Sequence, residues 1–225
     1  MHRGVAARLL RAVAKVSALA FTFAFVGAWV LVSSPEAWAA TDTFVEKRAD
    51  AALMSSLRKG GFVLYMRHGD TDNSRPDRMP AVDLDDCMTQ RPLSDAGRAK
   101  MRRIGQALRD AKIPVGRVLA SPMCRTRESA ELVVGKGFEP FEPLMYSANM
   151  TSEQKKPRIA ALRRLLTSPM DEGTNTLLVA HAPNLADLIG FFVKPEGTVV
   201  VFAQRGAEGY DYVASIHPDD WARLK

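Results

Sequence analysis

The chain has 225 residues, with 31 Lys and Arg, 25 Asp and Glu, 47% hydrophobic residues and only two cysteines. This composition excludes an intrinsically disordered chain, a collagen-like repeat and a small disulfide-stapled fold, because ordinary apolar content at this length can build a hydrophobic core. We therefore expect one globular domain over most of the chain.

The first forty residues have the three parts of a secretory signal peptide. Basic residues come first, an uncharged stretch over residues 16–35 follows, and the small-x-small sequence Ala37-Trp38-Ala39 ends the segment. We predict a signal peptide over residues 1–39, cleaved after Ala39, and a single domain over residues 40–225. An uncleaved membrane anchor is the alternative, because the uncharged run reaches the roughly 20 residues that a transmembrane helix needs.

Either fate of this segment places the domain outside the cytoplasm, in the periplasm or the extracellular space, where thiols meet an oxidising environment. Cleavage removes four of the 31 basic residues and one of the 25 acidic residues, which leaves 27 and 24 and a net charge of +3. The net charge is small, and the sequence has no clustered stripe of basic residues. It therefore favours a small-molecule partner over nucleic acid. Membrane contact is expected only through an uncleaved amino-terminal segment.

Beyond the targeting segment, stretches with helical periodicity alternate with short apolar runs. A helix capped by Ser94 and a long polar loop over residues 70–92 are clear in the pattern, whereas residues 137–157 give no readable conformation. This alternation predicts an α/β fold with a mostly parallel central sheet flanked by helices, the direction of the last strands being left open. The expected helices cover 43–57, 95–111, 124–134 and 184–192, and the expected strands cover 62–66, 115–120, 175–180, 198–203 and 211–216.

Three of the predicted strands end in residues suited to phosphoryl chemistry. Arg67 and His68 follow the first strand, Arg125 lies just past the second, and His181 follows the third. Ligands bind beyond the carboxyl ends of strands in open α/β sheets, so we expect these side chains to share a pocket. Arginine holds phosphoryl oxygens bidentately, and a neutral imidazole with one nitrogen held by a backbone carbonyl can attack phosphorus through the other.

Three motifs carry a resemblance to the histidine phosphatase superfamily, also called the phosphoglycerate mutase-like clan, over most of residues 60–216. They are Met66-Arg67-His68-Gly69-Asp70-Thr71, Ser121-Pro122-Met123-Cys124-Arg125-Thr126-Arg127-Glu128-Ser129-Ala130 and Ala180-His181-Ala182-Pro183-Asn184. The resemblance implies a phosphoglycerate mutase-like fold, a nucleophilic His68, and no metal or cofactor. It also implies that Arg67, Arg125 and His181 bind the phosphoryl oxygens.

Further residues near these motifs are candidates for substrate binding. Asn184 could instead cap the last predicted helix, and Arg91 could be an ordinary solvated loop residue. The full set of substrate-binding candidates is Gly69, Asp70, Thr71, Arg91 and Asn184.

The stretch from Asp85 to Arg91, with the cysteine beside Arg125, resembles a secreted bacterial subgroup that includes envelope phosphatases, among them a lipopolysaccharide-core sugar phosphatase. Cys87 and Cys124 form an even pair in a chain predicted to be exported, so we predict a disulfide that ties the long loop to the neighbourhood of Arg125. Two unrelated thiols are the alternative.

The sequence departs from the family at the proton donor. The acid-phosphatase branch has Asp directly after the second histidine, where this chain has Ala182, and the mutase branch uses Glu or Asp downstream of the second arginine. Glu142 and Asp86 are the preferred candidates, with Glu139 and Asp70 as others. Without a placed acid, the sequence favours phosphoesters with good leaving groups or substrates that supply the proton themselves.

Taken together, the residues predict a metal-independent hydrolase of phosphomonoesters that forms a phosphohistidine on His68, with an envelope sugar phosphate as one candidate substrate. A phosphomutase is one alternative; it would need a pocket that keeps the alcohol and excludes water. The other alternative is a catalytically silent envelope protein that binds phosphorylated sugars or lipid headgroups in the same cationic pocket.

Overall fold

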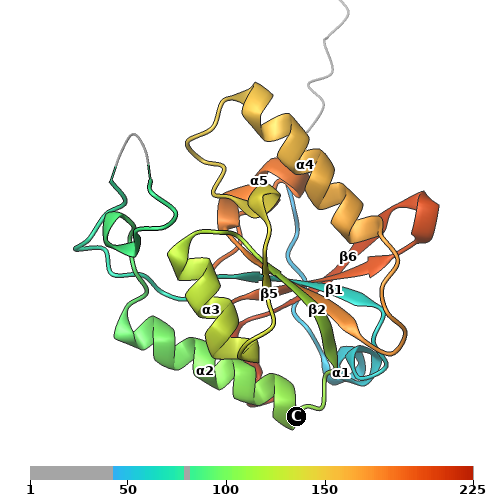
Figure 1. Ribbon diagram of the computed structural model, residues 1–225. Coiled ribbons are helices and arrows are strands. Elements are labelled where there is room, and N and C mark those ends of the chain that lie inside the picture. Colours follow the sequence, from blue (N-terminus) through green and yellow to red (C-terminus); the bar gives the residue numbers. More distant parts are fainter. Residues whose placement is uncertain (1–42, 79–81, 225) are drawn as a thin grey trace, which may run out of the picture. The chain divides into compact units, whose positions relative to one another are not determined.

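The computed structural model describes residues 43–78 and 82–224 (Figure 1). The predicted signal peptide or anchor and its cleavage site lie outside the described residues. The strands form one six-stranded sheet in the order β3-β2-β4-β1-β5-β6. Their bounds are β1 Phe62–Arg67, β2 Val115–Ala120, β3 Glu139–Pro140, β4 Asn175–Ala180, β5 Val199–Gln204 and β6 Tyr210–Ile216.

The sheet is mixed, with its parallel part in the order β3-β2-β4-β1 and its antiparallel part in β5 and β6. This confirms the predicted α/β class and its mostly parallel sheet, and it settles the direction of the last two strands. Every residue of β4 is buried. Strands that are covered on both faces consist of continuous runs of apolar residues, and such runs made β1 and β4 easy to predict from the sequence.

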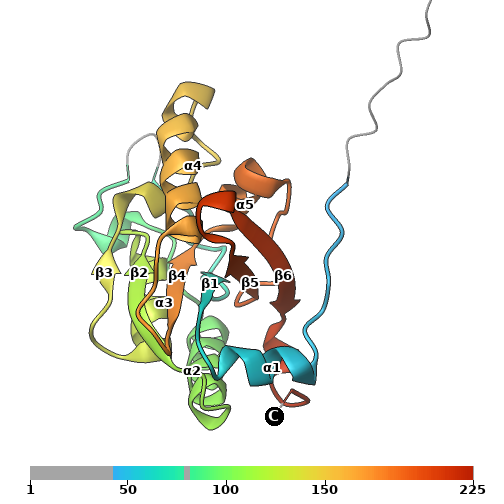
Figure 2. The same ribbon diagram turned by 90° about the vertical axis from the view of Figure 1, so that its right-hand side faces the viewer.

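Helices cover both faces of the sheet (Figures 1 and 2). Leu64 and Met66 of β1 point into a core shared with α1, α2 and α3, whereas Val63 and Tyr65 point into the core shared with α4 and α5. No helix of the described part is long and apolar enough to span a membrane. The helix bounds are α1 Ala51–Leu57, α2 Asp95–Asp110, α3 Cys124–Val134, α4 Ser152–Thr167 and α5 Ala182–Ile189, and single 3₁₀ turns are η1 Cys87–Thr89, η2 Glu142–Leu144, η3 Gly206–Glu208 and η4 Pro218–Asp220.

Some helix ends differ from the predicted ones for identifiable reasons. The predicted start of α1 at residue 43 was wrong, because Asp50 caps the helix by accepting from the Leu53 amide, 2.9 Å away. Helix α5 begins earlier than predicted, at Ala182, and ends at Ile189 because Gly190 adopts a left-handed conformation with φ 74°. The Ser94 cap of α2 is confirmed by the Gly97 amide, which donates to its hydroxyl at 3.0 Å.

Helix α4 was not predicted from the sequence. It begins with a capping box in which Thr151 and Gln154 satisfy each other's backbone amides. Pro157 lies inside the helix, where proline normally discourages a helical interpretation. The amphipathic pattern of α4 is weak compared with that of α2, so periodicity alone did not reveal it.

The strand register brings the three motif-bearing strand ends to one edge of the sheet. Arg67 at the end of β1 pairs with Ala180 at the end of β4, and Ala120 at the end of β2 pairs with Val179. The His68 amide then donates to the Ala180 carbonyl at 3.1 Å. The two histidines and the start of α3 therefore meet where parallel strands end, as predicted.

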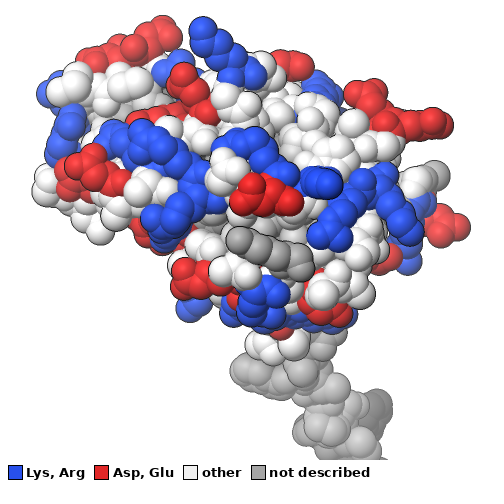
Figure 3. Space-filling model, turned by 90° about the horizontal axis from the view of Figure 1, so that it is seen from below, with Lys and Arg blue, Asp and Glu red and all other residues white. Residues whose placement is uncertain are grey.

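The face seen from below in Figure 1, on which α2 lies, carries charges of both signs. Figure 3 shows Lys and Arg side chains interspersed with Asp and Glu across this face. Arg98 of α2, for example, pairs with both Asp95 and Glu128. Basic residues on α2 therefore lie among acidic ones, as expected of a solvated amphipathic helix.

Candidate active site

His68 is buried at the carboxyl end of β1 and is oriented by its own backbone neighbour. Its Nδ1 lies 2.8 Å from the Gly69 carbonyl oxygen, which fixes a proton on Nδ1 and leaves Nε2 with a lone pair. Burial disfavours the imidazolium and the Arg125 charge adds to this, so the pKa of His68 falls to about 3. The side chain is thus a neutral base or nucleophile at ordinary pH.

Gly69 allows this close packing. A Cβ on Gly69 would lie 3.0 Å from the Met101 side chain and 3.1 Å from the Gly97 carbonyl oxygen of α2. The Gly69 amide donates to the Ser129 hydroxyl at 3.1 Å, and that hydroxyl donates to the Arg125 carbonyl at 2.7 Å. Ser129 therefore links the loop that follows His68 to the helix that carries Arg125.

His181 faces His68 from the end of β4, with 5.3 Å between the ring centroids. Its Nε2 lies 2.9 Å from the Ser121 hydroxyl, and its carbonyl accepts from the Tyr65 hydroxyl at 2.6 Å. Its Nδ1 is buried without a hydrogen-bond partner among the described residues. Burial, followed by repulsion from Arg125, lowers the pKa of His181 well below its usual value.

Arg125 lies in the first turn of α3 and is completely buried. Its Nη1 is 3.0 Å from the nearer carboxylate oxygen of Asp77, and its guanidinium carbon is 5.5 Å from the Tyr146 ring centroid. Its Nε and Nη2 are buried with no hydrogen-bond partner in the described part of the chain. Burial lowers the pKa of Arg125, whereas the Asp77 charge acts in the opposite direction.

Arg67 contacts three residues of the segment that leads into β5. Its Nη1 donates to the Val193 carbonyl at 2.7 Å, its Nη2 pairs with Glu196, and its guanidinium carbon is 5.6 Å from the Phe192 ring centroid. The Arg67 Nε is buried without a partner in the part that the structure describes. The Nε–H of Arg67 is therefore available for a ligand.

Arg91 lies close enough to the preceding four residues to act on them electrostatically, and we call the five together the cationic cluster: Arg67, His68, Arg91, Arg125 and His181. Its charge lowers the pKa of both histidines and of Arg67 and Arg125. Its Nη1 donates to the Asn73 side chain at 3.3 Å, and its Nε is another buried nitrogen without a partner among the described residues. The interpretation of Arg91 as an ordinary solvated loop residue therefore does not fit its position.

The other predicted substrate-binding residues have structural partners. Asp70 pairs with Lys100 at 2.6 Å, and Thr71 forms an isolated bridge with Leu93. Asn184 does not cap α5, because the N-cap position is His181. Its side-chain amide instead donates to the Met145 carbonyl at 2.8 Å and so fixes the segment beside Tyr146.

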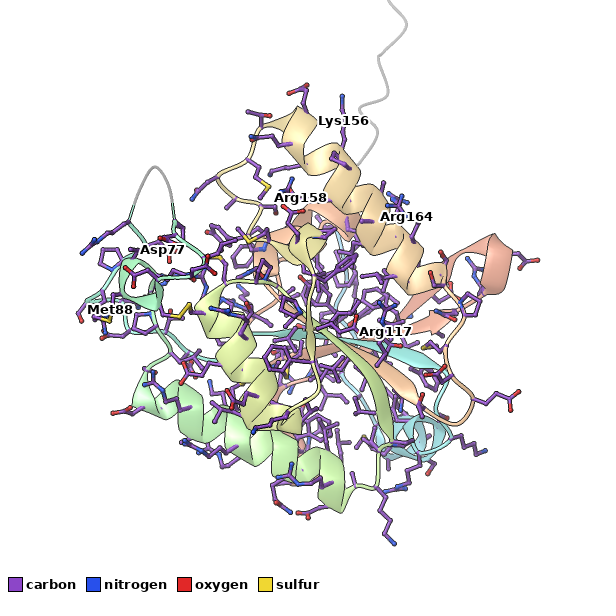
Figure 4. All side chains as sticks on the ribbon, in the orientation of Figure 1. Asp77, Met88, Arg117, Lys156, Arg158 and Arg164 are labelled. Carbon is purple, nitrogen blue, oxygen red and sulfur yellow. A yellow bond between two sulfur atoms is a disulfide. The ribbon has the colours of Figure 1, made fainter. Side chains whose placement is uncertain are left out.

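Three of the carboxylates that the sequence suggested as proton donors form ion pairs or a helix cap away from the cationic cluster. Glu142 is largely exposed and pairs with Arg158 of α4, Glu139 is exposed and pairs with Arg117, and Asp86 caps η1 on the surface. Asp77, which sequence reasoning missed, is a loop carboxylate that pairs with Arg125. Figure 4 labels its side chain on the loop that precedes α2. Only its position in a long polar loop near the first motif could have drawn attention to it.

The predicted disulfide is confirmed. Cys87 and Cys124 are bonded, with a Cα–Cα distance of 5.7 Å and a sequence separation of 37 residues. In the loop-entropy account, a closed loop of this size contributes about 4 kcal/mol to stability. The bond ties η1 to the first turn of α3, beside Arg125, and it is consistent with export.

Three side chains of the cluster are almost completely buried: only 3% of His68 and none of His181 or Arg125 is exposed. A groove of about 610 Å³ lies alongside, lined by the disulfide, Arg75, Met88 and Arg127 among others. Neither histidine lines this groove. The described residues contain no group of three or more His, Cys, Asp or Glu side chains placed to hold a metal ion.

Comparison with known proteins agrees with this geometry. Residues 63–143 match the sequence profile of the histidine phosphatase superfamily, branch 1. This match covers about a third of the chain and contains the first two of the three motifs, so the chain is similar to that superfamily over this part. No curated protein is similar enough in sequence to count as a match.

Solved structures share the fold at low sequence identity. The protein histidine phosphatase SixA, solved with tungstate, is 20% identical with a TM-score of 0.52 and covers 73% of this chain and 99% of its own. The alpha-ribazole phosphatase from Shigella flexneri is 16% identical with a TM-score of 0.53 and covers 70% and 96%. A phosphoserine phosphatase mutant from Entamoeba histolytica, solved with phosphoserine, is 12% identical with a TM-score of 0.52 and covers 68% and 95%.

Acidification is expected to destabilise the protein through His68. The folded protein keeps this imidazole neutral down to a pKa of about 3, whereas the unfolded chain binds a proton near pH 6.5. The unfolded state therefore holds more protons between these values, and stability falls as the pH falls. Urea unfolding at pH 7 and pH 5 should show a loss about 2 kcal/mol larger in the wild type than in His68→Asn. Equal losses in the two proteins would contradict the lowered pKa.

Proposed function

We propose that this protein is an exported phosphatase that hydrolyses a small-molecule phosphomonoester through a phosphohistidine on His68. The observation that carries the proposal is the environment of His68. A neutral imidazole with Nδ1 held by the Gly69 carbonyl is surrounded by buried N–H groups, on three arginines, that lack partners among the described residues. Buried donors of this kind are costly unless an anion accepts from them.

The proposed reaction has two steps. The Nε2 of His68 attacks phosphorus, the ester P–O bond breaks, and the alcohol leaves with a proton. Water then attacks phosphorus, the P–N bond breaks, and inorganic phosphate leaves as His68 returns to its neutral form. Arg67, Arg91, Arg125 and His181 would bind the phosphoryl oxygens, and these fixed donors would stabilise the charge that develops in both transition states.

The remaining sequence predictions become part of this proposal. Residues 1–39 would direct export, or stay as an anchor, and residues 40–225 would form one histidine phosphatase domain. The disulfide supports an oxidising destination. Phosphatases for phosphohistidine, phosphoserine and ribazole phosphate share the fold, and an envelope sugar phosphate fits the resemblance to secreted relatives.

The test is hydrolysis of an aryl phosphate by protein produced from the full chain, in the presence of a chelator. We expect equal release of the phenol and inorganic phosphate, together with a phosphoenzyme that is labile in acid and stable in base. Transfer of the phosphoryl group to an added alcohol, without release of phosphate, would replace the proposal with a phosphomutase. Binding of inorganic phosphate without turnover would replace it with a silent binding protein.

A further inference from the structure

Asp77 shares a guanidinium with the proposed phosphoryl site. Its two carboxylate oxygens lie 3.0 and 3.3 Å from Nη1 of Arg125. Arg125 keeps Nε and Nη2 without partners among the described residues, so one guanidinium can hold the carboxylate and a phosphoryl oxygen at the same time. A phosphoryl group bound in this way would lie directly beside Asp77.

A second contact fixes the carboxylate in this position. The Arg91 amide donates to the Asp77 carboxylate at 2.8 Å, while the Arg91 guanidinium belongs to the cationic cluster. Asp77 is thus held between two arginines that the proposed reaction uses for phosphoryl binding. Its side chain is 17% exposed, so it can exchange protons with solvent although Arg125 beneath it is fully buried.

We propose that Asp77 is the catalytic residue that gives a proton to the leaving group and later takes one from water. The inference rests on the proposed phosphatase function. In the proposed role, Asp77 enters the first step with its carboxyl group protonated and is returned to that form by the second step.

The proton balance closes over the two steps. As the P–N bond to His68 forms and the ester P–O bond breaks, the Asp77 carboxyl transfers its proton to the leaving oxygen and becomes a carboxylate. In the second step this carboxylate takes a proton from water as the water oxygen bonds to phosphorus and the P–N bond breaks. Asp77 ends protonated and His68 neutral, as they began.

The experiment compares Asp77→Asn with wild type on phenyl phosphate, a poor leaving group, and dinitrophenyl phosphate, which needs little acid assistance. The loss of kcat/KM on the phenyl ester should be about 100-fold or more, and that on the dinitrophenyl ester less than about 10-fold. The phosphoenzyme should accumulate in the variant with the dinitrophenyl ester, because its hydrolysis lacks a base. Asp85→Asn, an exposed carboxylate of the same loop, should behave as wild type.

Equal losses on the two esters, or unchanged rates on both, would overturn the role of Asp77. Tighter binding of inorganic phosphate with faster turnover would also overturn it, because Asp77 would then only compete for Arg125. An intact disulfide and an unchanged unfolding transition would show that the variant is folded. If wild type hydrolyses neither ester, or if His68→Ala retains turnover, the proposed phosphatase function is wrong.

Discussion

Replacing His68 with alanine should reduce turnover of an aryl phosphate by at least about 10⁴-fold and remove the trapped phosphoenzyme. The expected loss is this large because, in the proposed reaction, the His68 side chain forms the covalent bond to phosphorus, whereas the remaining donors can bind phosphate but cannot attack it. Release of phosphate under steady-state conditions and acid-sensitive labelling of the protein measure the two effects.

His68→Asn is the matched variant, because the asparagine amide can still donate to the Gly69 carbonyl that Nδ1 contacts. It should fold and should bind inorganic phosphate while remaining inactive. His217→Asn is the control. His217 lies near the carboxyl end of the chain and pairs with Glu46. A phosphoenzyme that persists in both His68 variants would mean that another side chain is the nucleophile.

Replacing Arg125 with lysine should lower kcat/KM by about 10² to 10³-fold. Lysine keeps the positive charge, so the partly exposed Asp77 retains a counter-ion, but lysine lacks the planar fork that binds a carboxylate and a phosphoryl oxygen together. Most of the loss should fall on kcat, because charge on the phosphoryl oxygens grows in the transition state.

Arg127→Lys, two residues along α3, is the control for this substitution. Arg127 contacts the Leu84 carbonyl and the disulfide sulfur atoms. It should retain kcat/KM within about 3-fold, as expected of a surface change away from a site. Full activity of Arg125→Lys would show that a single charge suffices and that the guanidinium geometry is irrelevant to the reaction.

The sequence predicted the parts of the site that local structure determines. His68 and His181 each follow a short apolar run, and a buried strand with polar residues at its end is visible without tertiary information. The bounds of α3 were predicted correctly, which placed Arg125 at the start of a helix. Parallel pairing then brings these strand ends together.

The residues that sequence reasoning missed depend on long-range contacts. Asp77 reaches Arg125 across 48 residues and Glu196 reaches Arg67 across 129, and no periodicity encodes such contacts. Tyr146 lies in a segment whose conformation depends on α4, which was itself missed because Pro157 interrupts its pattern. Partners within the sheet edge were predictable, whereas partners supplied by loops were not.

The bond between Cys87 and Cys124 has a consequence for where the protein can work. It fastens the loop that carries Asp77 and Arg91 to the helix turn that carries Arg125. In a reducing cytoplasm this fastening would be absent, and a newly made chain would hold the loop by weaker contacts alone. Under the proposed export and phosphatase function, the site would mature only after translocation, and phosphate esters inside the cell would be spared.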